Sequence, residues 1–244
     1  MLAHGITDNG LCWTPVAKVL EGEYDVIMYD ARGHGLSEKP ETGYTWEVLA
    51  EDLAGLIDAL GLDRPLVMGH SLGAATAMLL AARYPAKTRG IVLEDPPCSD
   101  QAIPPEALRA RAETQRQEIT ARKAMSEEEL LAYVRQRSPT WPEAELGPWV
   151  QAKKQVSPHV TALYGAPRPD WRQAVKAIRC PTLWLTADPA LGAIVTPAVA
   201  QEIKRLMPTS EIVYVEGAGH CIHREQFDAA MEPVKRFLRR VAQG

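Results

Sequence analysis

Long apolar runs and cysteine pairs are both missing from this sequence of 244 residues, and each absence excludes a class of protein. No stretch of about 18 consecutive apolar residues occurs, which excludes an ordinary membrane-spanning helix. The first residues, Met1 to Gly5, lack both the charged start and the apolar core of a signal peptide. We therefore predict a cytoplasmic protein with no membrane partner.

Cysteines are few, and they are scattered: Cys12, Cys98, Cys180 and Cys221. None of them forms a C-x-x-C pair, so the sequence has no zinc or dithiol redox motif of that kind, and we expect free thiols. The formal net charge of −4, without a block of basic residues, argues against a nucleic-acid partner. No cluster of histidine and acidic residues suggests a metal, and we expect no cofactor.

Strand-like apolar stretches alternate with helical ones along most of the chain. The strand-like stretches begin at Tyr24, Leu66, Gly90, Pro181 and Glu211. This alternation predicts βαβ units and a mostly parallel sheet with helices on both faces. A chain of 244 residues can form one such α/β domain with a buried core. Ligands of parallel sheets bind at the carboxyl ends of the strands.

One segment combines a strand, a sharp turn and a helix. The strand from Leu66 leads into Gly69-His70-Ser71-Leu72-Gly73, and a helix-forming run, Ala74 to Ala82, follows. Gly-x-Ser-x-Gly in this context is typical of a nucleophile elbow, in which the residues flanking the serine must be small. Ser71 is therefore the candidate nucleophile. The backbone N–H of Leu72, at the start of the helix, is a candidate donor to an oxyanion.

Four motifs resemble, in the same order along the chain, those of α/β-hydrolase-fold serine hydrolases of the esterase and C–C-bond-hydrolase type. They are His4-Gly5, Asp30-Ala31-Arg32-Gly33-His34-Gly35-Leu36-Ser37, Gly69-His70-Ser71-Leu72-Gly73 and Gly217-Ala218-Gly219-His220. The resemblance implies that Ile6, after His4-Gly5, supplies a second oxyanion N–H. In this family a hairpin and most of a third strand precede the His-Gly motif. The resemblance therefore implies that these amino-terminal strands are missing here.

The resemblance also implies a catalytic triad in the order nucleophile, acid, histidine. Ser71, Asp188 and His220 follow this order, and each comes after a predicted strand at the same edge of the sheet. We assign His220 as general base and then general acid, and Asp188 as the carboxylate that orients it. Glu94 and Asp95, at the exit of an earlier strand, stay open as alternative acids, because the spacing before Asp188 is shorter than is usual in the family.

Residues 98–172 show helical patterns and no strand pattern, which matches the helical cap over the active site in this family. We therefore divide the chain into core residues 1–97, a cap over residues 98–172 and core residues 173–244. Trp141, Trp149 and Tyr164 are candidates for substrate contact. For each of these three, anchoring the cap to the core is an alternative that stays open.

A serine at the elbow argues against the dehalogenases and epoxide hydrolases of this fold, which use aspartate there. We predict a carboxylic ester hydrolase that acts on small to medium acyl esters or lactones through an acyl-enzyme. Two alternatives stay open. One is a hydrolase of a C–C bond next to a carbonyl, with the same triad, and the other is a non-catalytic ligand-binding protein of this fold. The expected partner is a small ester substrate, and a homodimer stays open.

Overall fold

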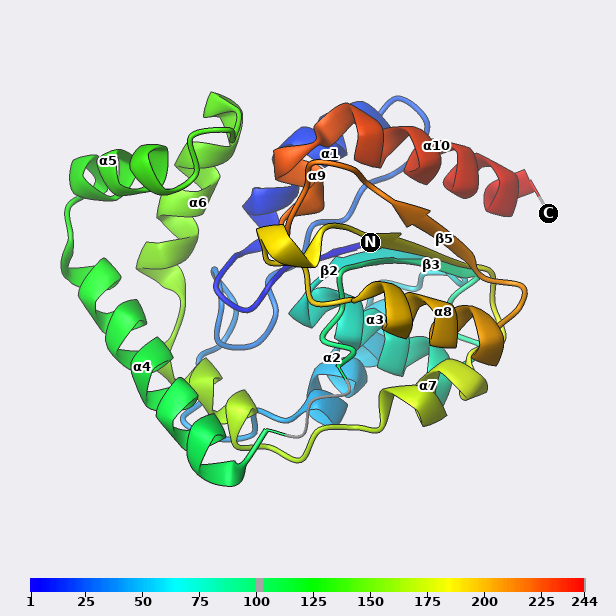
Figure 1. Cartoon of the computed structure of the whole chain (residues 1–244), viewed down its shortest axis with the longest axis horizontal. Coiled ribbons are helices and arrows are strands. Elements are labelled where there is room, and N and C mark those ends of the chain that lie inside the picture. Colours follow the sequence, from blue (N-terminus) through cyan, green and yellow to red (C-terminus); the bar gives the residue numbers. More distant parts are fainter. Residues whose placement is uncertain (100–102, 244) are drawn as a thin grey trace.

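A parallel sheet forms the centre of the molecule (Figure 1). The structure, a computed structural model, describes residues 1–99 and 103–243. The 5 strands lie in the order β1-β2-β3-β4-β5, and each neighbouring pair is parallel. They are β1 (Leu2–Ala3), β2 (Leu66–His70), β3 (Gly90–Glu94), β4 (Thr182–Thr186) and β5 (Glu211–Tyr214). The predicted α/β fold with a mostly parallel sheet is confirmed.

Helices cover both faces of this sheet (Figure 1). One face packs against α2 (Trp46–Ala59), α3 (Leu72–Arg83), α7 (Trp171–Ala177) and α8 (Pro197–Leu206), and the other against α1 (Thr14–Leu20) and α10 (Phe227–Gln243). In β4, Trp184 belongs to the first core, whereas Leu183 and Leu185 belong to the second. Successive side chains of a strand point to opposite faces, so a strand covered on both sides is apolar throughout.

The ends of α2 follow from its sequence. Thr45 precedes the helix, and its Oγ1 accepts the N–H of Val48 at 3.2 Å, which satisfies one of the donors left unpaired at a helix start. Gly61 follows the helix with φ +63°, a left-handed conformation that glycine adopts without a steric penalty. Among the helices of the described residues, none is long and apolar enough to cross a membrane.

A group of helices lies to one side of the sheet, between β3 and β4 in the sequence (Figure 1). We call residues 105–164 the helical arm; it contains α4 (Pro105–Ala124), α5 (Glu127–Arg137), α6 (Glu143–Gln155) and the 3-10 helix η2 (Pro158–Tyr164). Ser126 and Glu129 form a capping box at the start of α5. The described part of the predicted cap contains no strand, and its residues 100–102 lie outside the described residues.

The stretch from Tyr24 to Tyr29 takes less part in the sheet than its sequence predicts. Met28 makes one isolated parallel bridge to Leu2, and the N–H of Leu2 donates to the carbonyl of Ile27 at 2.8 Å. Its neighbour β1 is 2 residues long and so offers few backbone groups for pairing. The short strand that precedes His4-Gly5 nevertheless lies within the sheet, beside β2.

Candidate active site

Ser71 lies in the sharp turn between β2 and α3. Its backbone angles, φ 52° and ψ −111°, fall in a region that residues with a side chain rarely adopt. A Cβ on Gly69 would lie 2.3 Å from the carbonyl carbon of Gly73, and a Cβ on Gly73 would lie 2.0 Å from the carbonyl oxygen of Ala3. Neither position has room for a larger residue, and the two glycines therefore allow the strand and the helix to approach as an elbow requires.

Three side chains from distant parts of the chain form one hydrogen-bonded row. The hydroxyl of Ser71 donates to Nε2 of His220 at 3.0 Å, and Nδ1–H of His220 donates to Oδ2 of Asp95 at 2.6 Å. The side chain of His220 is 31% exposed, whereas that of Asp95 is 0% exposed. The base, His220, is accessible to solvent and hydrogen-bonds the nucleophile, whereas the carboxylate that binds the base is buried. This is the arrangement of a Ser-His-Asp triad.

The carboxylate of Asp95 is held in place by backbone groups. The N–H of Ile194 donates to both of its oxygens, at 3.0 and 2.8 Å, and the N–H of Val195 donates to Oδ1 at 2.9 Å. The N–H of Asp95 itself donates to the carbonyl of Leu185 in β4 at 3.0 Å. These bonds fix the direction in which Oδ2 faces the imidazole of His220, and bonds from N–H groups to an ionised carboxylate are strong.

His220 pairs with Asp95 and not with Asp188, so the prediction that Asp188 is the orienting acid is wrong. Oδ1 of Asp188 instead accepts the N–H of Ala190 at 2.8 Å and caps the 3-10 helix η3 (Pro189–Leu191). Short polar side chains are favoured in this role at turns and helix starts. The sequence did contain a signal for Asp95, because an acid directly after a buried strand was one of the two alternatives.

The two predicted oxyanion donors lie on either side of the elbow. Leu72 is the first residue of α3, directly after Ser71. In the sheet register Ala3 pairs with Gly69, so the turn that contains Ile6 leaves β1 next to the elbow. His34 supports this turn, because its Nε2–H donates to the carbonyl of Ile6 at 2.7 Å. The oxyanion role of both N–H groups stays a prediction.

A second acid–histidine pair lies directly beside the first. Glu94 precedes Asp95, and its carboxylate accepts the backbone N–H of His223 at 3.0 Å and the Nδ1–H of that residue at 2.8 Å to each oxygen. Burial alone would raise the pKa of Glu94, but the histidines His223 and His70 and the bonds from His223 lower it to about 2. The end of β3 is thus joined twice to the segment that carries His220.

His70, inside the elbow, joins the same group of rings. Its Nε2–H donates to the carbonyl oxygen of His220 at 2.9 Å, and its ring centroid lies 4.7 Å from that of His220. Burial lowers the pKa of His70 to about 3, so the ring is neutral near pH 7. A neutral ring behind His220 supports the loop without adding a positive charge to it.

Replacing Glu94 by Gln is expected to lower kcat by up to about 100-fold, because small displacements of a catalytic group are costly. It should also lower the free energy of unfolding by about 1–3 kcal/mol, since buried bonds to His223 are weakened. Steady-state kinetics and urea unfolding measure the two effects. Glu216→Gln, at an exposed position before His220, is the matched control. Wild-type kcat in a destabilised Glu94→Gln protein would show that the pair does not position His220.

Buried ion pairs attach α6 of the helical arm to the core. Lys153 Nζ lies 3.0 Å from Oδ1 of Asp8, and Arg224 lies 3.0 Å from Oδ2 of Asp8 and 3.1 Å from Oε2 of Glu145. Burial would raise the pKa of Asp8, but Arg224 and Lys153 hold it well below its usual value. Removing one partner of such a group leaves an uncompensated buried charge, which is strongly destabilising. The arm therefore has a fixed place beside the active site.

The three aromatic residues predicted to contact substrate make packing contacts in the structure. The Trp149 ring stacks on Tyr133 with centroids 6.1 Å apart, and Arg224 lies over Trp141 at 4.6 Å from its ring centroid. Tyr164 carries Arg111 over its ring at 5.0 Å. The contact of Trp141 with Arg224 joins the arm to the core and fits the anchoring alternative, whereas the contacts of Trp149 and Tyr164 lie within the arm. The substrate-binding role of all three stays a prediction.

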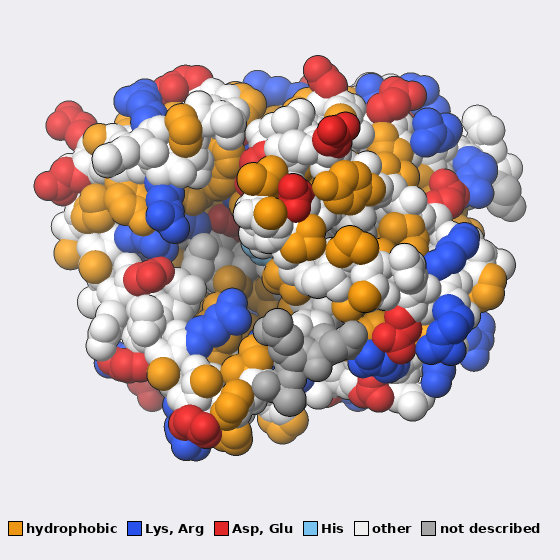
Figure 2. Space-filling model, in the orientation of Figure 1, with side chains coloured by type: hydrophobic (Ala, Val, Ile, Leu, Met, Phe, Trp, Pro, Cys, Tyr) orange, Lys and Arg blue, Asp and Glu red, His pale blue; other side chains and the backbone are white. Residues whose placement is uncertain are grey.

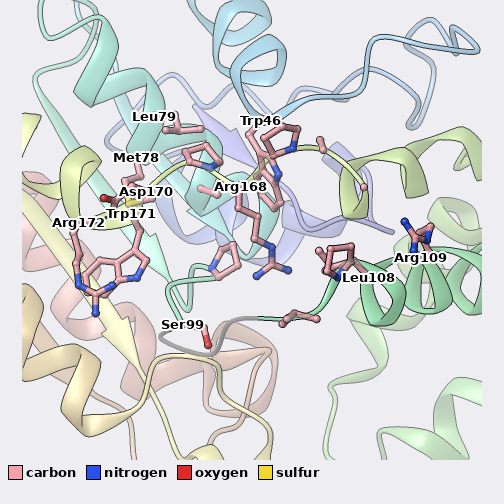
Figure 3. A pocket seen from close by; sticks show the side chains of 18 residues that line it. Trp46, Met78, Leu79, Ser99, Leu108, Arg109, Arg168, Asp170, Trp171 and Arg172 are labelled. Carbon is pink, nitrogen blue, oxygen red and sulfur yellow. Dashed lines mark hydrogen bonds between the residues drawn. The ribbon is translucent and has the colours of Figure 1, made fainter.

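A cavity of about 580 Å³ lies between α3, the start of α4 and the segment before α7 (Figure 3). Ser71 and His220 are not among its lining residues, but Ala75 lines it, and the N–H of Ala75 donates to the carbonyl of Ser71 at 3.0 Å. The cavity therefore begins one helical turn from the nucleophile. Sequence reasoning missed its apolar walls, which include Trp46, Met78, Leu79 and Trp171. Their helical spacing indicated core packing only.

The surface is hollowed between the helical arm and the part of the molecule that contains the sheet (Figure 2). Ser71 and Asp95 directly follow the carboxyl ends of β2 and β3. Ligands of parallel sheets bind at this edge of the sheet. Among the described residues, no group of at least three His, Cys, Asp or Glu side chains could hold a metal ion. The arrangement can perform nucleophilic catalysis through Ser71 with its own residues.

Comparison with known proteins agrees with this geometry. The chain is 31% identical over 248 residues to "2-(acetamidomethylene)succinate hydrolase" of Mesorhizobium japonicum, which covers 96% of this chain and 86% of that protein. It is 30% identical over 244 residues to "N-formylmaleamate deformylase" of Pseudomonas putida, which covers 98% and 87%. A solved structure of E-2-(acetamidomethylene)succinate hydrolase matches with a TM-score of 0.81 and 29% identity, over 98% of this chain and 90% of that one.

The family assignment rests on nearly the whole length of the chain. Residues 1–232 match the profile described as "Alpha/beta hydrolase family". That range contains the elbow at Ser71, the acid Asp95 and the histidine His220, and the relatives that match over nearly the full chain are hydrolases by name. This chain belongs to the alpha/beta hydrolase family and is a hydrolase.

Proposed function

We propose that this chain is a serine hydrolase that cleaves a C–N or C–C bond next to a carbonyl group in a small substrate. The observation that supports the proposal is the row from Ser71 through His220 to Asp95, with distances of 3.0 and 2.6 Å. Such a row activates a serine hydroxyl for attack on a carbonyl carbon. The preference for carboxylic esters that we expected from the sequence is unconfirmed. The names of the relatives support the alternative, hydrolysis of a C–C bond next to a carbonyl, better than ester hydrolysis.

The reaction would begin when Oγ of Ser71 forms a bond to the carbonyl carbon of the substrate. The proton of Oγ passes to Nε2 of His220, and Asp95 stabilises the imidazolium. Negative charge develops on the carbonyl oxygen, which the N–H groups of Ile6 and Leu72 would bind. Collapse of this intermediate breaks the bond to the leaving nitrogen or carbon, which takes the proton from His220. Water, deprotonated by His220, then releases the acyl group from Ser71.

The kind of bond is suggested by the names of the two curated relatives. One acts on an acetamidomethylene succinate and the other removes a formyl group from a maleamate nitrogen, as their names state. Neither name describes a simple ester. The same triad serves C–N, C–C and ester cleavage, so the choice of bond depends on how the substrate is held rather than on Ser71.

A matched set of compounds tests the proposal. An N-acyl amide, a β-diketone and a methyl ester that share one carbon skeleton would be incubated with the wild-type protein and with Ser71→Ala. We expect turnover of the amide or of the diketone to exceed that of the ester, and no turnover by the variant. Turnover of the ester alone would return the assignment to a carboxylesterase. Failure of all three compounds, together with no labelling of Ser71 by a fluorophosphonate, would indicate a ligand-binding protein.

A further inference from the structure

One arginine that lines the large cavity, Arg168, has no ion-pair partner among the described residues. Arg168 lines the cavity, and Figure 3 shows its side chain reaching into the space near Leu108. Within residues 1–99 and 103–243, no carboxylate forms an ion pair with Arg168. The surrounding residues, by partial desolvation and through Arg111, lower the pKa of its guanidinium. The side chain is nevertheless exposed, so its guanidinium is accessible to an anion that enters the cavity.

A second arginine makes the region more positive. Arg111 is held over the ring of Tyr164 at 5.0 Å, and its charge also acts to lower the pKa of Arg168. Two neighbouring guanidinium groups make the potential at this part of the cavity positive, which favours binding of an anion. Arginine is the residue best suited to hold a carboxylate, because its fork of N–H groups matches the two oxygens.

Of the other charged residues that line the cavity, Arg109 adds a further positive charge, whereas Arg172 and Asp170 have partners. Arg172 pairs with Glu202 at 2.7 and 2.8 Å. Asp170 caps α7, because its Oδ1 accepts the N–H groups of Arg172 and Gln173 at 2.9 and 3.4 Å. The remaining acid of the lining therefore has a local role and does not neutralise Arg168. The rest of the wall is largely apolar, so a negatively charged ligand group would be directed to Arg168 and Arg109.

We propose that Arg168 binds a carboxylate of the substrate in this cavity, so that the enzyme selects small carboxylic acids over their neutral analogues. This inference rests on the proposed function, because it assumes that the cavity serves Ser71. Ala75, which lines the cavity, is one helical turn from Ser71, or about 6 Å along α3. In the proposed pose the substrate presents its carbonyl to Ser71 while its carboxylate extends past Ala75 into the cavity.

Binding of succinate to the Ser71→Ala protein tests the proposal without turnover. Isothermal titration calorimetry would compare Ser71→Ala alone with the double variants that add Arg168→Gln, Arg168→Lys or Arg116→Gln. Arg116 is exposed on α4, where it pairs with Glu113, and serves as the control. We expect Arg168→Gln to weaken succinate binding about tenfold to a hundredfold, as the loss of a charge-assisted hydrogen bond does. Arg168→Lys should retain part of the affinity, and Arg116→Gln should retain all of it.

Monomethyl and dimethyl succinate complete the test, because they remove one or both charges from the same skeleton. If Arg168 selects the carboxylate, dimethyl succinate should bind weakly to Ser71→Ala. The double variant with Arg168→Gln should bind the three ligands with equal affinity. Equal succinate affinity with and without Arg168→Gln would overturn the proposal, as would equal binding of all three ligands to Ser71→Ala. If succinate binding depends on Arg168 but no compound is hydrolysed by the wild-type protein, the carboxylate site stands and the proposed function fails.

Discussion

Asp95→Asn is expected to lower kcat by about 10⁴-fold while leaving the protein folded, a loss of the size seen when the acid of a Ser-His-Asp triad becomes an amide. Oδ2 of Asp95 accepts Nδ1–H of His220, and this bond keeps the proton on Nδ1 and leaves Nε2 free to receive the proton of Ser71. Asparagine keeps the shape of the side chain. Steady-state kinetics on a hydrolysed compound would measure the loss.

The backbone around Asp95 decides how the asparagine would lie. The N–H groups of Ile194 and Val195 both point at the carboxylate, so the amide oxygen must face them and the amide NH₂ must face His220. Nδ1 of His220 then has to accept, which moves its proton to Nε2. A protonated Nε2 cannot accept the proton of Ser71. His220 therefore no longer acts as a base, although the positions of the atoms hardly change.

Asp188→Asn is the control for this prediction. Asp188 caps η3 through one bond to the N–H of Ala190, and an asparagine oxygen can accept that bond equally well. We therefore expect kcat within about twofold of wild type, since surface changes away from such features have small effects. The assignment of Asp95 would be wrong if Asp188→Asn were the severe variant and Asp95→Asn the mild one.

The sequence was sufficient for the elbow and the histidine because their constraints are local. Gly69 and Gly73 are required by contacts within the turn and with Ala3, and the strand and helix around Ser71 have clear patterns. His220 follows β5 in a glycine-rich loop, and Gly217 adopts φ +74° there. Each of these features is specified within a few residues, so a motif is enough to locate it.

The acid could not be chosen from the sequence because two strands offer one at the same edge of the sheet. β3 and β4 are neighbours, with Glu94 opposite Leu185, and Asp95 and Asp188 follow their respective ends. Which carboxylate faces His220 depends on how the turn after β4 folds. There Asp188 is used to cap η3, and residues 194 and 195 return to bind Asp95. The choice of Asp95 therefore depends on contacts between residues about 100 positions apart in the sequence.

The walls of the cavity were missed for a similar reason. Met78 and Leu79 are in a helix that is buried almost throughout, so their sequence pattern gives no sign that a space lies beside them. Arg168 is in a proline-containing segment without a regular pattern. Only the packing of α3, α4 and residues 165–172 brings these side chains around one space. A cavity is a property of the assembled elements, and no single element predicts it.

Ser71→Ala and Ser71→Gly are both expected to abolish turnover, with kcat lower by about 10⁴-fold or more, because both remove the hydroxyl that attacks the carbonyl. They should differ in stability. Ser71 has φ 52° and ψ −111°, a conformation that costs on the order of 1–3 kcal/mol for a residue with a Cβ. Alanine keeps that cost, whereas glycine removes it.

The gain from glycine is reduced by the freedom that it adds to the unfolded chain, roughly 0.4–1 kcal/mol. We therefore expect Ser71→Gly to unfold with a free energy about 1 kcal/mol greater than that of Ser71→Ala, measured by urea denaturation at pH 7. Adding Asp95→Asn to Ser71→Ala should cause almost no further loss of activity, because the two residues act as a unit. An equal or lower stability of Ser71→Gly would mean that the elbow stores no strain at Ser71. Residual turnover by Ser71→Ala that still falls with Asp95→Asn would mean that another nucleophile uses His220.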